Sequence, residues 1–589
     1  MAAFSGRIWG RISSYRHINE HIITSLLAII IGILGGYGAV LFRHLIRGVQ
    51  FLFYQNGSDF LQFAAEVPFY IKIAMPALAG AIVGPLVHFW AREAKGHGVP
   101  EVMEAVALKG GVIRRRVAFA EILASAISIG GGGSVGREGP IAMIGSSVGS
   151  SVGQILRVSR DRQRTFVGCG AAAGIAATFN APLGGVLFAL EILLGDFGVS
   201  TFSPIVLSSV TATIISRYHF GNFPAFAVPH YEVVSYYEYP LYFALGIVAA
   251  LVAILFVTIL YKSEDLFDEV PIPEYLKPIL GGAIVGCMLI VFPQVFGVGY
   301  GAIDLSLTNK LAATILFTLI FVKIAATSIT IGSGMSGGVF APSLMIGAMA
   351  GGWFGQVVHS LFPDLTATGG AYALVAMGAV VAATTHAPIT AILILFELTS
   401  QYQIILPLMI SCITAALLAG ALKKGNIYNI KLLRRGVELH MGRERSILRQ
   451  LRVQDVILTH PHAVPESMYL VDIIETFKRT NASYLQVIDD QDELAGIISF
   501  RDVRAVLQEE ELGHLIIARD VATRNVITVT PNDTLEDVLK KMGIKGISQL
   551  PVVKVEDPKK VIGVLEENAI IATYNREVMA RELSRPAGG

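Results

Sequence analysis

One segment of this chain occurs twice. Residues 126–154 (AISIGGGGSVGREGPIAMIGSSVGSSVGQ) and 328–356 (SITIGSGMSGGVFAPSLMIGAMAGGWFGQ) align without a gap, with 13 identical positions out of 29. Each copy has a glycine cluster followed by a proline, Pro140 or Pro342, which can open a helix because its missing N–H is not needed there. A helix that begins inside a membrane has free N–H groups, and glycine lets a ligand approach them. Each copy therefore indicates half of an anion site, and such duplicated halves are typical of transporters.

The duplication continues downstream. AATFNAPLGGVLFALE (176–191) parallels AATTHAPITAILILFE (382–397), which places Glu191 on Glu397. The offset between the copies is 206 residues there and 202 in the first pair, so the repeat is one long unit with halves at about 20–216 and 240–435. The sequence leaves open whether the halves are parallel or inverted.

The composition indicates a membrane protein with a soluble tail. The 589 residues are 53% hydrophobic and 15% charged, too apolar for an ordinary soluble protein. Residues 441–589 hold 42 of the 91 charged side chains, and the first 440 residues hold the other 49. We therefore expect a membrane domain over 1–437 and a soluble region over 438–589. The net charge of +1 gives no case for nucleic acid as a partner.

The apolar stretches suggest the topology. About eleven lie between Ile22 and Leu422, and several, such as 117–130 and 338–351, are short or broken by glycine, which marks a pathway at membrane depth. The first stretch lacks a signal-peptide cleavage pattern, so it is expected to remain as a span. By the positive-inside rule, basic residues outside the first and last spans place both termini in the cytoplasm: Arg7, Arg11, Arg16, Lys423, Lys424, Arg434 and Arg435. The prediction is a multi-pass protein of the cell (inner) membrane. The three cysteines lie in apolar stretches and are expected to be buried, inert thiols rather than a metal site.

Four motifs resemble one family. They are Gly96-His97-Gly98-Val99-Pro100-Glu101, Gly136-Arg137-Glu138-Gly139-Pro140, Gly338-Val339-Phe340-Ala341-Pro342 and Tyr428. In this order they are similar to the anion-pathway elements of the CLC chloride channels and chloride–proton antiporters. The resemblance covers about residues 20–435. It implies an all-α polytopic membrane domain with an inverted repeat and broken helices, and a homodimer with one pore per subunit.

The motifs also have a physical interpretation. Chloride must lose water in a low-dielectric site, so it needs N–H and O–H donors without a large positive charge, which would bind it too tightly. The resemblance implies chloride binding by Gly96, His97, Gly98, Gly136, Arg137, Gly139, Gly338, Val339, Phe340 and Tyr428. Arg137 is favoured as a structural or field-setting charge over a direct ligand. For Gly145, Gly149 and Gly153, the alternative to a role in the anion site is close packing between helices.

Glu138 is the expected gate. A carboxylate among glycines at membrane depth is costly unless positive helix termini compensate for it. When ionised it can occupy an anion site and block the path; when protonated it loses affinity for the donors and swings away. The gate would then respond to pH and voltage. The alternative is a structural Glu138 satisfied by Arg137.

Two positions depart from the family pattern. Where the first motif usually has serine between its glycines, this chain has His97, which can donate an N–H or turn aside and leave binding to the backbone. Family antiporters have an acid directly after the position of Glu191 as an inner proton acceptor, and here it is Ile192. Isoleucine cannot relay a proton, which favours passive chloride conduction over obligatory exchange. Glu191 or ordered water could replace the acid, although Glu191 is favoured as a structural charge at a helix end.

The soluble region contains a second duplication. Units at about 453–508 and 519–576 each have an opening strand (Val456-Ile457; Val526-Ile527), an amphipathic helix (Leu470–Lys478; Leu535–Met542), an apolar strand (Tyr484–Ile488; Gln549–Val553) and a glycine-led strand (Gly496–Ser499; Gly563–Leu565). This pattern resembles a cytoplasmic α/β pair of CBS domains, which often bind adenine nucleotides. Ser499 and Asp502 resemble the ribose-binding pattern, but the second unit lacks its counterpart. Nucleotide binding and a scaffold that couples to the pore both remain open.

Other classes of protein fit less well. The GGGGSVGREGP segment lacks the Gly-Lys-Ser/Thr of a phosphate loop, so neither an NTPase nor another enzyme is expected, and no cofactor is required. A CBS-bearing divalent-cation transporter should have clustered carboxylates within the membrane, whereas glycine-rich helix starts favour anions. A proton-coupled chloride antiporter is the main alternative to the channel.

Overall fold

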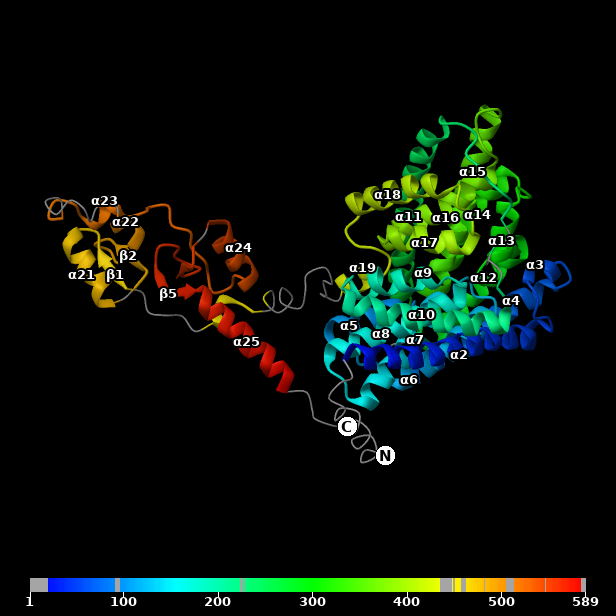
Figure 1. Ribbon diagram of the computed structural model, residues 1–589, viewed down its shortest axis with the longest axis horizontal. Coiled ribbons are helices and arrows are strands. Elements are labelled where there is room, and N and C mark those ends of the chain that lie inside the picture. The colour runs from blue at the N-terminus through cyan, green and yellow to red at the C-terminus, as the bar shows by residue number, and fades with distance from the viewer. Residues whose placement is uncertain are drawn as a thin grey trace. The chain divides into compact units, whose positions relative to one another are not determined.

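The computed structural model describes residues 20–90, 96–222, 226, 228–434, 448, 451–456, 462–480, 482–504, 513–545 and 547–583. The chain forms two compact units, Met1–Gly436 and Val437–Gly589, shown in Figure 1. Of the basic residues that suggested cytoplasmic termini, Arg7, Arg11, Arg16 and Arg435 lie outside the described residues.

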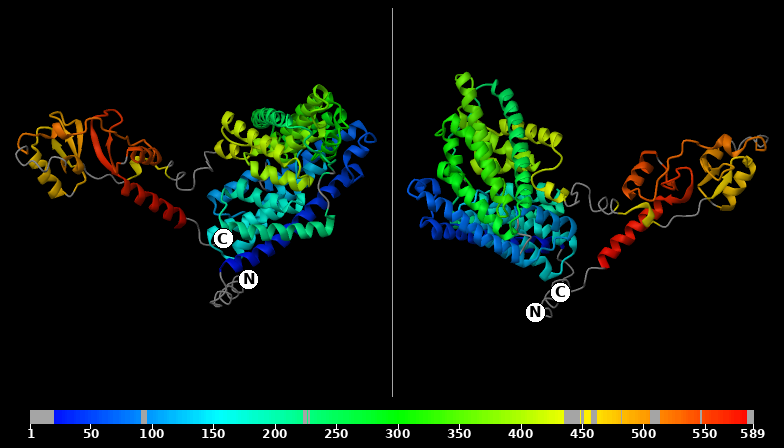
Figure 2. Two further views of the ribbon diagram at one scale, coloured as in Figure 1. Left: turned by 45° about the horizontal axis from the view of Figure 1, so that its top comes forward. Right: turned by 180° about the vertical axis from the view of Figure 1, so that it is seen from behind.

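The named elements of the first unit are helical. Its first half contains α2 (Glu20–Tyr54), α3 (Phe60–Phe63), α4 (Phe69–Pro85), α5 (Val99–Leu108), α6 (Arg115–Gly130), α7 (Glu138–Leu156), α8 (Arg160–Phe179), α9 (Pro182–Leu187) and α10 (Val199–Phe220). Its second half contains α11 (Glu238–Glu269), α12 (Lys277–Val291), α13 (Tyr300–Leu307), α14 (Ala313–Gly332), α15 (Phe340–Leu361), α16 (Gly369–Thr385), α17 (Pro388–Thr399), α18 (Ile405–Leu422) and α19 (Asn429–Arg434). Wider π-helical turns, Leu86–Trp90 and Phe188–Leu194, extend α4 and α9. The blue-to-cyan first half and the green-to-yellow second half lie against each other in Figures 1 and 2.

Within the described residues, seven helices are long and apolar enough to cross a membrane. They are Ile22–Tyr54, Phe69–Trp90, Val199–Phe220, Glu238–Glu269, Glu274–Val291, Ala313–Gly332 and Ile405–Leu422. Three shorter apolar helices are Pro182–Leu194, Gly369–Thr385 and Pro388–Thr399. The expected interruption within 338–351 is confined to the residues before Phe340, because α15 is continuous from Phe340 to Leu361. The glycines of α15 therefore do not break it.

Glycines bring neighbouring helices of each half into close contact. A Cβ at Gly145 would overlap the carbonyl oxygen of Gly170 in α8, and a Cβ at Gly149 would overlap that of Phe166. The equivalent glycines of α15, Gly347 and Gly351, face α16 in the same way. Close helix packing, the alternative at these positions of α7, is what the structure shows.

The cysteines differ in exposure. Cys169 and Cys412 are buried, as expected, but Cys287 is exposed on α12. The prediction of a buried thiol is wrong for Cys287, because an apolar stretch in a membrane protein can face lipid as readily as protein.

The described residues of the second unit form two small sheets. The first has the order β1 (Ala463–Pro465), β2 (Tyr484–Ile488) and β3 (Leu494–Ser499), with β1 parallel to β2 and β2 antiparallel to β3. The second pairs β4 (Gln549–Val553) with β5 (Val561–Glu566) in antiparallel fashion. The helices of this unit are α21 (Leu470–Thr480), α22 (Phe500–Arg504), α23 (Ala518–Val521), α24 (Leu535–Lys545) and α25 (Glu567–Leu583).

The predicted opening strands are displaced. Val456 follows a short 3₁₀ turn (Val453–Asp455), Ile457 lies outside the described residues, and no strand covers Val526-Ile527. In the first predicted CBS repeat, the parallel pairing with β2 involves β1 instead. In the second predicted CBS repeat, Val529 forms a parallel bridge to Val552 of β4. The position of each opening strand is set by its pairing with the strand that follows the helix. Two adjacent apolar residues in the sequence do not indicate this pairing.

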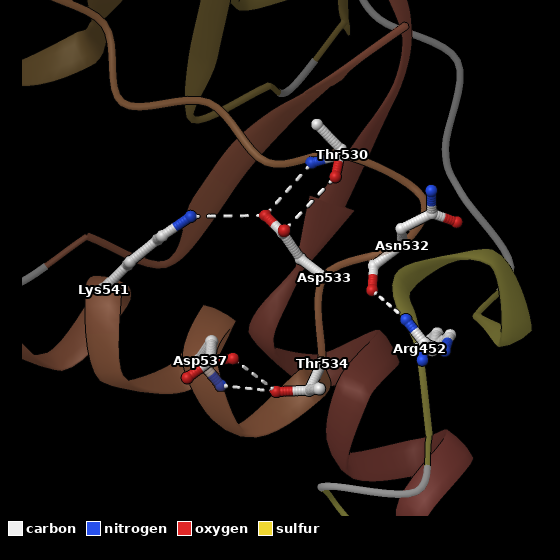
Figure 3. Close-up of polar contacts among 7 residues, drawn as sticks. All are labelled: Arg452, Thr530, Asn532, Asp533, Thr534, Asp537 and Lys541. Atoms are coloured by element: carbon white, nitrogen blue, oxygen red, sulfur yellow. Dashed lines mark hydrogen bonds and ion pairs between the residues drawn. The ribbon is translucent and has the colours of Figure 1, made fainter. Parts of the chain in front are cut away.

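Polar side chains fix the start of α24, as shown in Figure 3. The Asp533 carboxylate accepts hydrogen bonds from the N–H and hydroxyl of Thr530 (both 3.2 Å) and from Lys541 Nζ (3.2 Å). Arg452 donates to the carbonyl of Asn532. Burial alone would raise the pKa of Asp533, but the bonds from Thr530 and Lys541 outweigh it and lower the pKa.

Candidate functional site

The duplicated glycine segments meet at the centre of the first unit. Gly136 N–H donates to Gly338 O (2.7 Å), and Gly338 N–H donates to Gly136 O (2.6 Å). These two residues are 202 positions apart, so each pairs with its own repeat equivalent. An antiparallel pair of equivalent residues requires a local two-fold axis between them.

Further reciprocal bonds extend this symmetry. Ser134 N–H donates to Thr330 Oγ1 (3.2 Å), and Ser336 N–H, in the equivalent position, donates to Ser128 Oγ (3.3 Å). The turn before α5 joins the same cluster, since Gly337 N–H donates to Gly96 O (3.2 Å). Three of the four predicted motifs are thus hydrogen-bonded neighbours.

Glu138 lies between the two glycine segments. It is the first residue of α7 and its side chain is buried. Its carboxylate accepts hydrogen bonds from the Ala341 N–H (3.3 Å) at the start of α15 and from the Tyr300 hydroxyl (3.4 Å). An anionic side chain therefore occupies one donor at a helix N-terminus, which is where a free anion would bind.

Arg137 faces a cavity beside Glu138. The cavity has a volume of about 420 Å³, and Arg43, Arg47, Arg137 and Tyr300 are among the residues that line it. The Arg137 guanidinium lies 5.2 Å from the centre of the Tyr300 ring, and its Nε has no hydrogen-bond partner among the described residues. Three guanidinium groups on one cavity attract anions to the Glu138 side of the site.

His97 and Tyr428 form a second buried polar group. Both side chains are buried and their rings lie 6.0 Å apart. Neither ring nitrogen of His97 has a hydrogen-bond partner among the described residues. Gly96 and Gly98 on either side have φ values of 107° and 73°, a backbone conformation that favours glycine. A Cβ at Gly139 would overlap His97 O, so this turn lies directly against the start of α7.

Val339 and Phe340 stand at the N-terminal end of α15. Val339 precedes the helix and Phe340 begins it, and both are buried. The Phe340 ring lies 5.6 Å from that of Phe179 and 6.4 Å from that of Phe188. Two aromatic rings of the first half therefore pack against the residue that begins α15.

Glu191 caps a helix of the other half. Its carboxylate accepts the N–H groups of Ile389 (3.3 Å) and Thr390 (2.7 Å) at the start of α17. Glu397 does the same for the N–H groups of Leu183 (3.0 Å) and Gly184 (2.7 Å) in α9. The expected structural charge at a helix end is thus present, with its partner in the opposite repeat.

Ile192 is the next residue in the π-helical turn Phe188–Leu194, and its side chain is buried. Its neighbour Glu191 is already bonded to α17, so neither side chain offers a free carboxylate at this position.

Glu121 and Lys323, two buried ionisable side chains beside the glycine segments, were missed in the sequence. Lys323 donates to Ser134 Oγ (2.9 Å) and to the carbonyls of Gly297 (3.0 Å) and Val295 (3.3 Å). Glu121, 202 positions earlier, accepts from Ser336 Oγ (3.0 Å). A charge surrounded by apolar residues was the available signal: Lys323 is the single charge of α14, and Glu121 follows the two arginines at the start of α6 by five residues.

Ser499 and Asp502 satisfy each other in the second unit. The Ser499 hydroxyl donates to Asp502 Oδ2 (2.6 Å), as does the Ser499 N–H (2.8 Å). A cavity of about 320 Å³ lies nearby, and its lining includes Thr480, Gln486 and Gln549 but neither of these two residues.

Comparisons with known proteins identify the family of each unit. The model of the voltage gated chloride channel family matches residues 79–420, and the CBS domain model matches 453–509 and 518–575. A protein of Ralstonia nicotianae named as a ClcB-like chloride channel protein is 35% identical over 69% of this chain and 96% of its own length. The H(+)/Cl(-) exchange transporter ClcA of Vibrio cholerae serotype O1 is 32% identical over 68% of this chain and 87% of its own. The crystal structure of a slow cyanobacterial Cl-/H+ antiporter is similar with a TM-score of 0.65 and 28% identity, covering 71% of this chain and 98% of that one.

Proposed function

Because the chain belongs to the voltage gated chloride channel (CLC) family and carries two CBS domains, we propose that it conducts chloride passively across a membrane with Glu138 as the gate. The observation that carries the proposal is the Glu138 carboxylate on the Ala341 N–H at the start of α15. A negatively charged oxygen already uses the donors that chloride needs.

The proposed chloride ligands lie on either side of this carboxylate. We assign to chloride the backbone N–H groups of Val339 and Phe340, which directly precede the Ala341 N–H that holds Glu138. His97 and Tyr428 serve a second position, where the imidazole has hydrogen-bonding capacity with no partner among the described residues. The glycines at 96, 98, 136, 139 and 338 allow the close backbone approach, and Arg137 sets the field at the cavity.

Gating follows from competition between two anions. While ionised, Glu138 holds the Ala341 N–H and excludes chloride. When a proton neutralises it, the charge-assisted part of the hydrogen bond is lost and the side chain can leave. Acid pH and a voltage that draws chloride from the cavity side therefore both favour the open state.

Passive conduction is favoured by the residues at the inner proton position. Ile192 has no titratable group, and the carboxylate of Glu191 caps α17 through two backbone N–H groups. A group that holds a helix start in place is poorly suited to exchange a proton on every transport cycle.

A proton-coupled antiporter is the second candidate. Its support is the similarity to the exchange transporter ClcA and to the cyanobacterial antiporter structure. Both candidates use the same chloride path and the same gate, and they differ in whether protons move in a fixed ratio to chloride.

One experiment separates the two candidates. Purified protein in liposomes is given a chloride gradient while a potassium ionophore holds the voltage near zero, and chloride and proton fluxes are recorded together. Rapid chloride flux without uphill proton movement supports the channel. Sustained uphill proton movement at a fixed ratio would establish the antiporter, and flux that follows the potassium gradient would exclude both.

Replacing Glu138 tests the gate directly. The Glu138→Ala variant removes the competing carboxylate, so its chloride flux should be largely independent of pH. Persistent strong activation by acid would place the gate elsewhere, with His97 as the first residue to examine.

The remaining proposals concern assembly and orientation. The family resemblance supports a homodimer with one pore per subunit, and Lys423 and Lys424 directly after α18 support cytoplasmic termini in a cell membrane. For the CBS pair we propose a scaffold role, since Ser499 and Asp502 are bonded to each other. Tight binding of ATP to the purified protein, measured by calorimetry, would contradict that role.

A further inference from the structure

Glu121 is a buried carboxylate with spare hydrogen-bonding capacity. It lies on α6 and its side chain has no solvent exposure. Oε1 accepts from the hydroxyls of Ser336 (3.0 Å) and Ser125 (3.3 Å), whereas Oε2 has no partner among the described residues. Two neutral hydroxyls compensate a buried negative charge only in part, so this site favours a bound proton.

Glu121 lies next to the inner part of the candidate anion path. A Cβ built on Gly98 would be 3.3 Å from Glu121 Oε1 and 3.2 Å from Gly139 O, so the carboxyl reaches the turn that carries His97. Ser336, its main partner, is bonded through its N–H to Ser128 and lies two residues before Gly338. The carboxyl is thus part of the same cluster of turns as the gate.

A partly exposed ion pair lies near Glu121 and acts on it electrostatically. Glu101 on α5 and Lys431 on α19 form an ion pair at 2.7 Å, and their side chains are 11% and 17% exposed. Lys431 Nζ lies 3.0 Å from the position of a Cβ on Gly96, which places the pair at the other side of the His97 turn. Among the described residues, the charged and hydrogen-bonding groups that act on Glu121 are Glu101, Lys431, Ser125 and Ser336, and His97 stands on the adjacent turn.

An ionised Glu121 and a chloride ion oppose each other. Both are negative, both lie in a dry part of the protein, and the ion pair of Glu101 with Lys431 contributes little net charge. Each of two like charges in such a site raises the free energy of the other. Protonation of Glu121 removes this electrostatic repulsion.

We propose that Glu121 is a proton-binding site linked to chloride at the His97–Tyr428 position, so that chloride binding takes up a proton from the Glu101–Lys431 side. The Glu121 carboxylate takes the proton from a hydronium ion of the solvent: one O–H bond forms on the carboxyl, one O–H bond of the hydronium ion breaks, and water and a neutral carboxylic acid remain. The inference rests on the proposed function, because it requires chloride at that position. It assigns a role to a residue outside the four motifs.

The test uses the full-length Glu138→Gln variant in detergent, which removes the competing gate carboxylate. Chloride titrations by calorimetry in buffers of different ionisation enthalpy, from acid to alkaline pH, give the number of protons taken up. We expect up to about one proton per chloride, and a dissociation constant that rises by at most about tenfold per pH unit while the carboxyl releases its proton.

Glu138→Gln/Glu121→Gln should bind chloride with no proton uptake and with little dependence on pH. The matched control Glu138→Gln/Asp304→Asn, which changes a carboxyl beside α3 and not beside His97, should keep the uptake. A protonated-carboxyl band in the chloride-induced infrared difference spectrum should disappear only in the Glu121 variant. This spectrum tests the assignment of the proton to Glu121 directly, in Glu138→Gln protein that still binds chloride.

Three results would overturn the inference. Uptake that persists without Glu121 would place the proton on another group, such as His97. Chloride binding with no uptake in Glu138→Gln at any pH would remove the linkage while leaving the proposed function intact. An absence of chloride binding in all variants would contradict the proposed function and the inference together.

Discussion

The two halves of the first unit place opposite charges in equivalent positions. Lys323 donates to Ser134 in the other half, and Glu121 accepts from Ser336, which is the same contact under the pseudo-two-fold axis. The backbone bonds around them remain reciprocal, as in the pair Gly136 and Gly338. The two halves therefore share the same backbone hydrogen bonds but differ in the charge of the buried side chain. The Lys323 side, near the arginine-lined cavity, attracts anions, whereas the Glu121 side opposes them unless a proton is bound.

Making the two positions alike should have the largest effect. Lys323→Glu replaces a buried cation by an anion beside Ser134 and the carbonyls of Val295 and Gly297. We expect chloride flux in liposomes to fall by about a hundredfold, equivalent to about 2.7 kcal/mol. Glu121→Lys also gives both halves the same charge at this position, but a positive one. Its chloride flux is the comparison for that of Lys323→Glu. Equal flux in wild type and Lys323→Glu would show that the charge difference has no part in conduction.

The helix contacts should respond alike in both halves. Gly149→Ala forces a methyl group against the Phe166 carbonyl, and Gly351→Ala forces one against the Tyr372 carbonyl. Each should lower the free energy of unfolding by about 1–3 kcal/mol, measured by thermal unfolding in detergent. Gly48→Ala is the control, because a Cβ there meets nothing within 4 Å. A loss in one half with none in the other would break the equivalence.

The reciprocal carboxylate caps give a smaller effect. Glu191→Gln and Glu397→Gln each remove a charge that accepts two N–H groups at a helix start in the other half. Each change should cost about 0.5–2 kcal/mol of stability in the same assay, as loss of a helix cap does. Coupled proton transport that fails only in Glu191→Gln would sharpen the difference between the halves, because it would assign a proton role to Glu191 alone.

The CBS pair offers the smallest effect. Asp533 stands two residues before α24, and the corresponding position before α21 is Met468. Because the pKa of Asp533 is lowered in the folded state, its contribution to stability is present above the usual carboxyl pKa and is lost as the pH falls through the lowered one. Asp533→Asn should therefore be less stable than wild type at neutral pH, by about 1 kcal/mol or less for a partly exposed pair.

Hydrogen exchange of the peptides around α24 and α21 measures this prediction in the whole protein. Wild type and Asp533→Asn should differ in α24 at neutral pH and converge in strong acid, while α21 should be the same in both. An equal change in the two helices would show that Asp533 acts on the whole unit.

Local signals in the sequence were sufficient for the elements that carry a strong pattern. β2 and β4 have the predicted bounds, and α7 and α15 begin two residues before Pro140 and Pro342, within the first turn that proline tolerates. The opening strands were misplaced because only pairing with β2 and β4 defines them. For the same reason the partner of Glu191 was not predictable, since Thr390 lies 199 residues away and no local pattern reports the contact.

The candidate site was predictable as a set of motifs but not as an arrangement. Gly136 and Gly338 were identified from the repeat, yet their direct pairing depends on how the two halves fold together. Glu121 and Lys323 each have apolar neighbours in the sequence, and the aligned 29-residue segments begin just after both. Their equivalence became informative only when the structure placed Ser336 and Ser134 beside them.

The reciprocal caps also constrain how the protein is made. α9 receives its carboxylate from Glu397, 214 residues after Leu183. At about 5–20 residues per second, a ribosome needs about 10–40 s to add that length of chain. During this interval the first half is already emerging while the N–H groups at the start of α9 have no acceptor from Glu397. The nascent first half therefore needs water or the insertion machinery to satisfy those groups, and a fragment ending before α17 would remain in that unfinished condition.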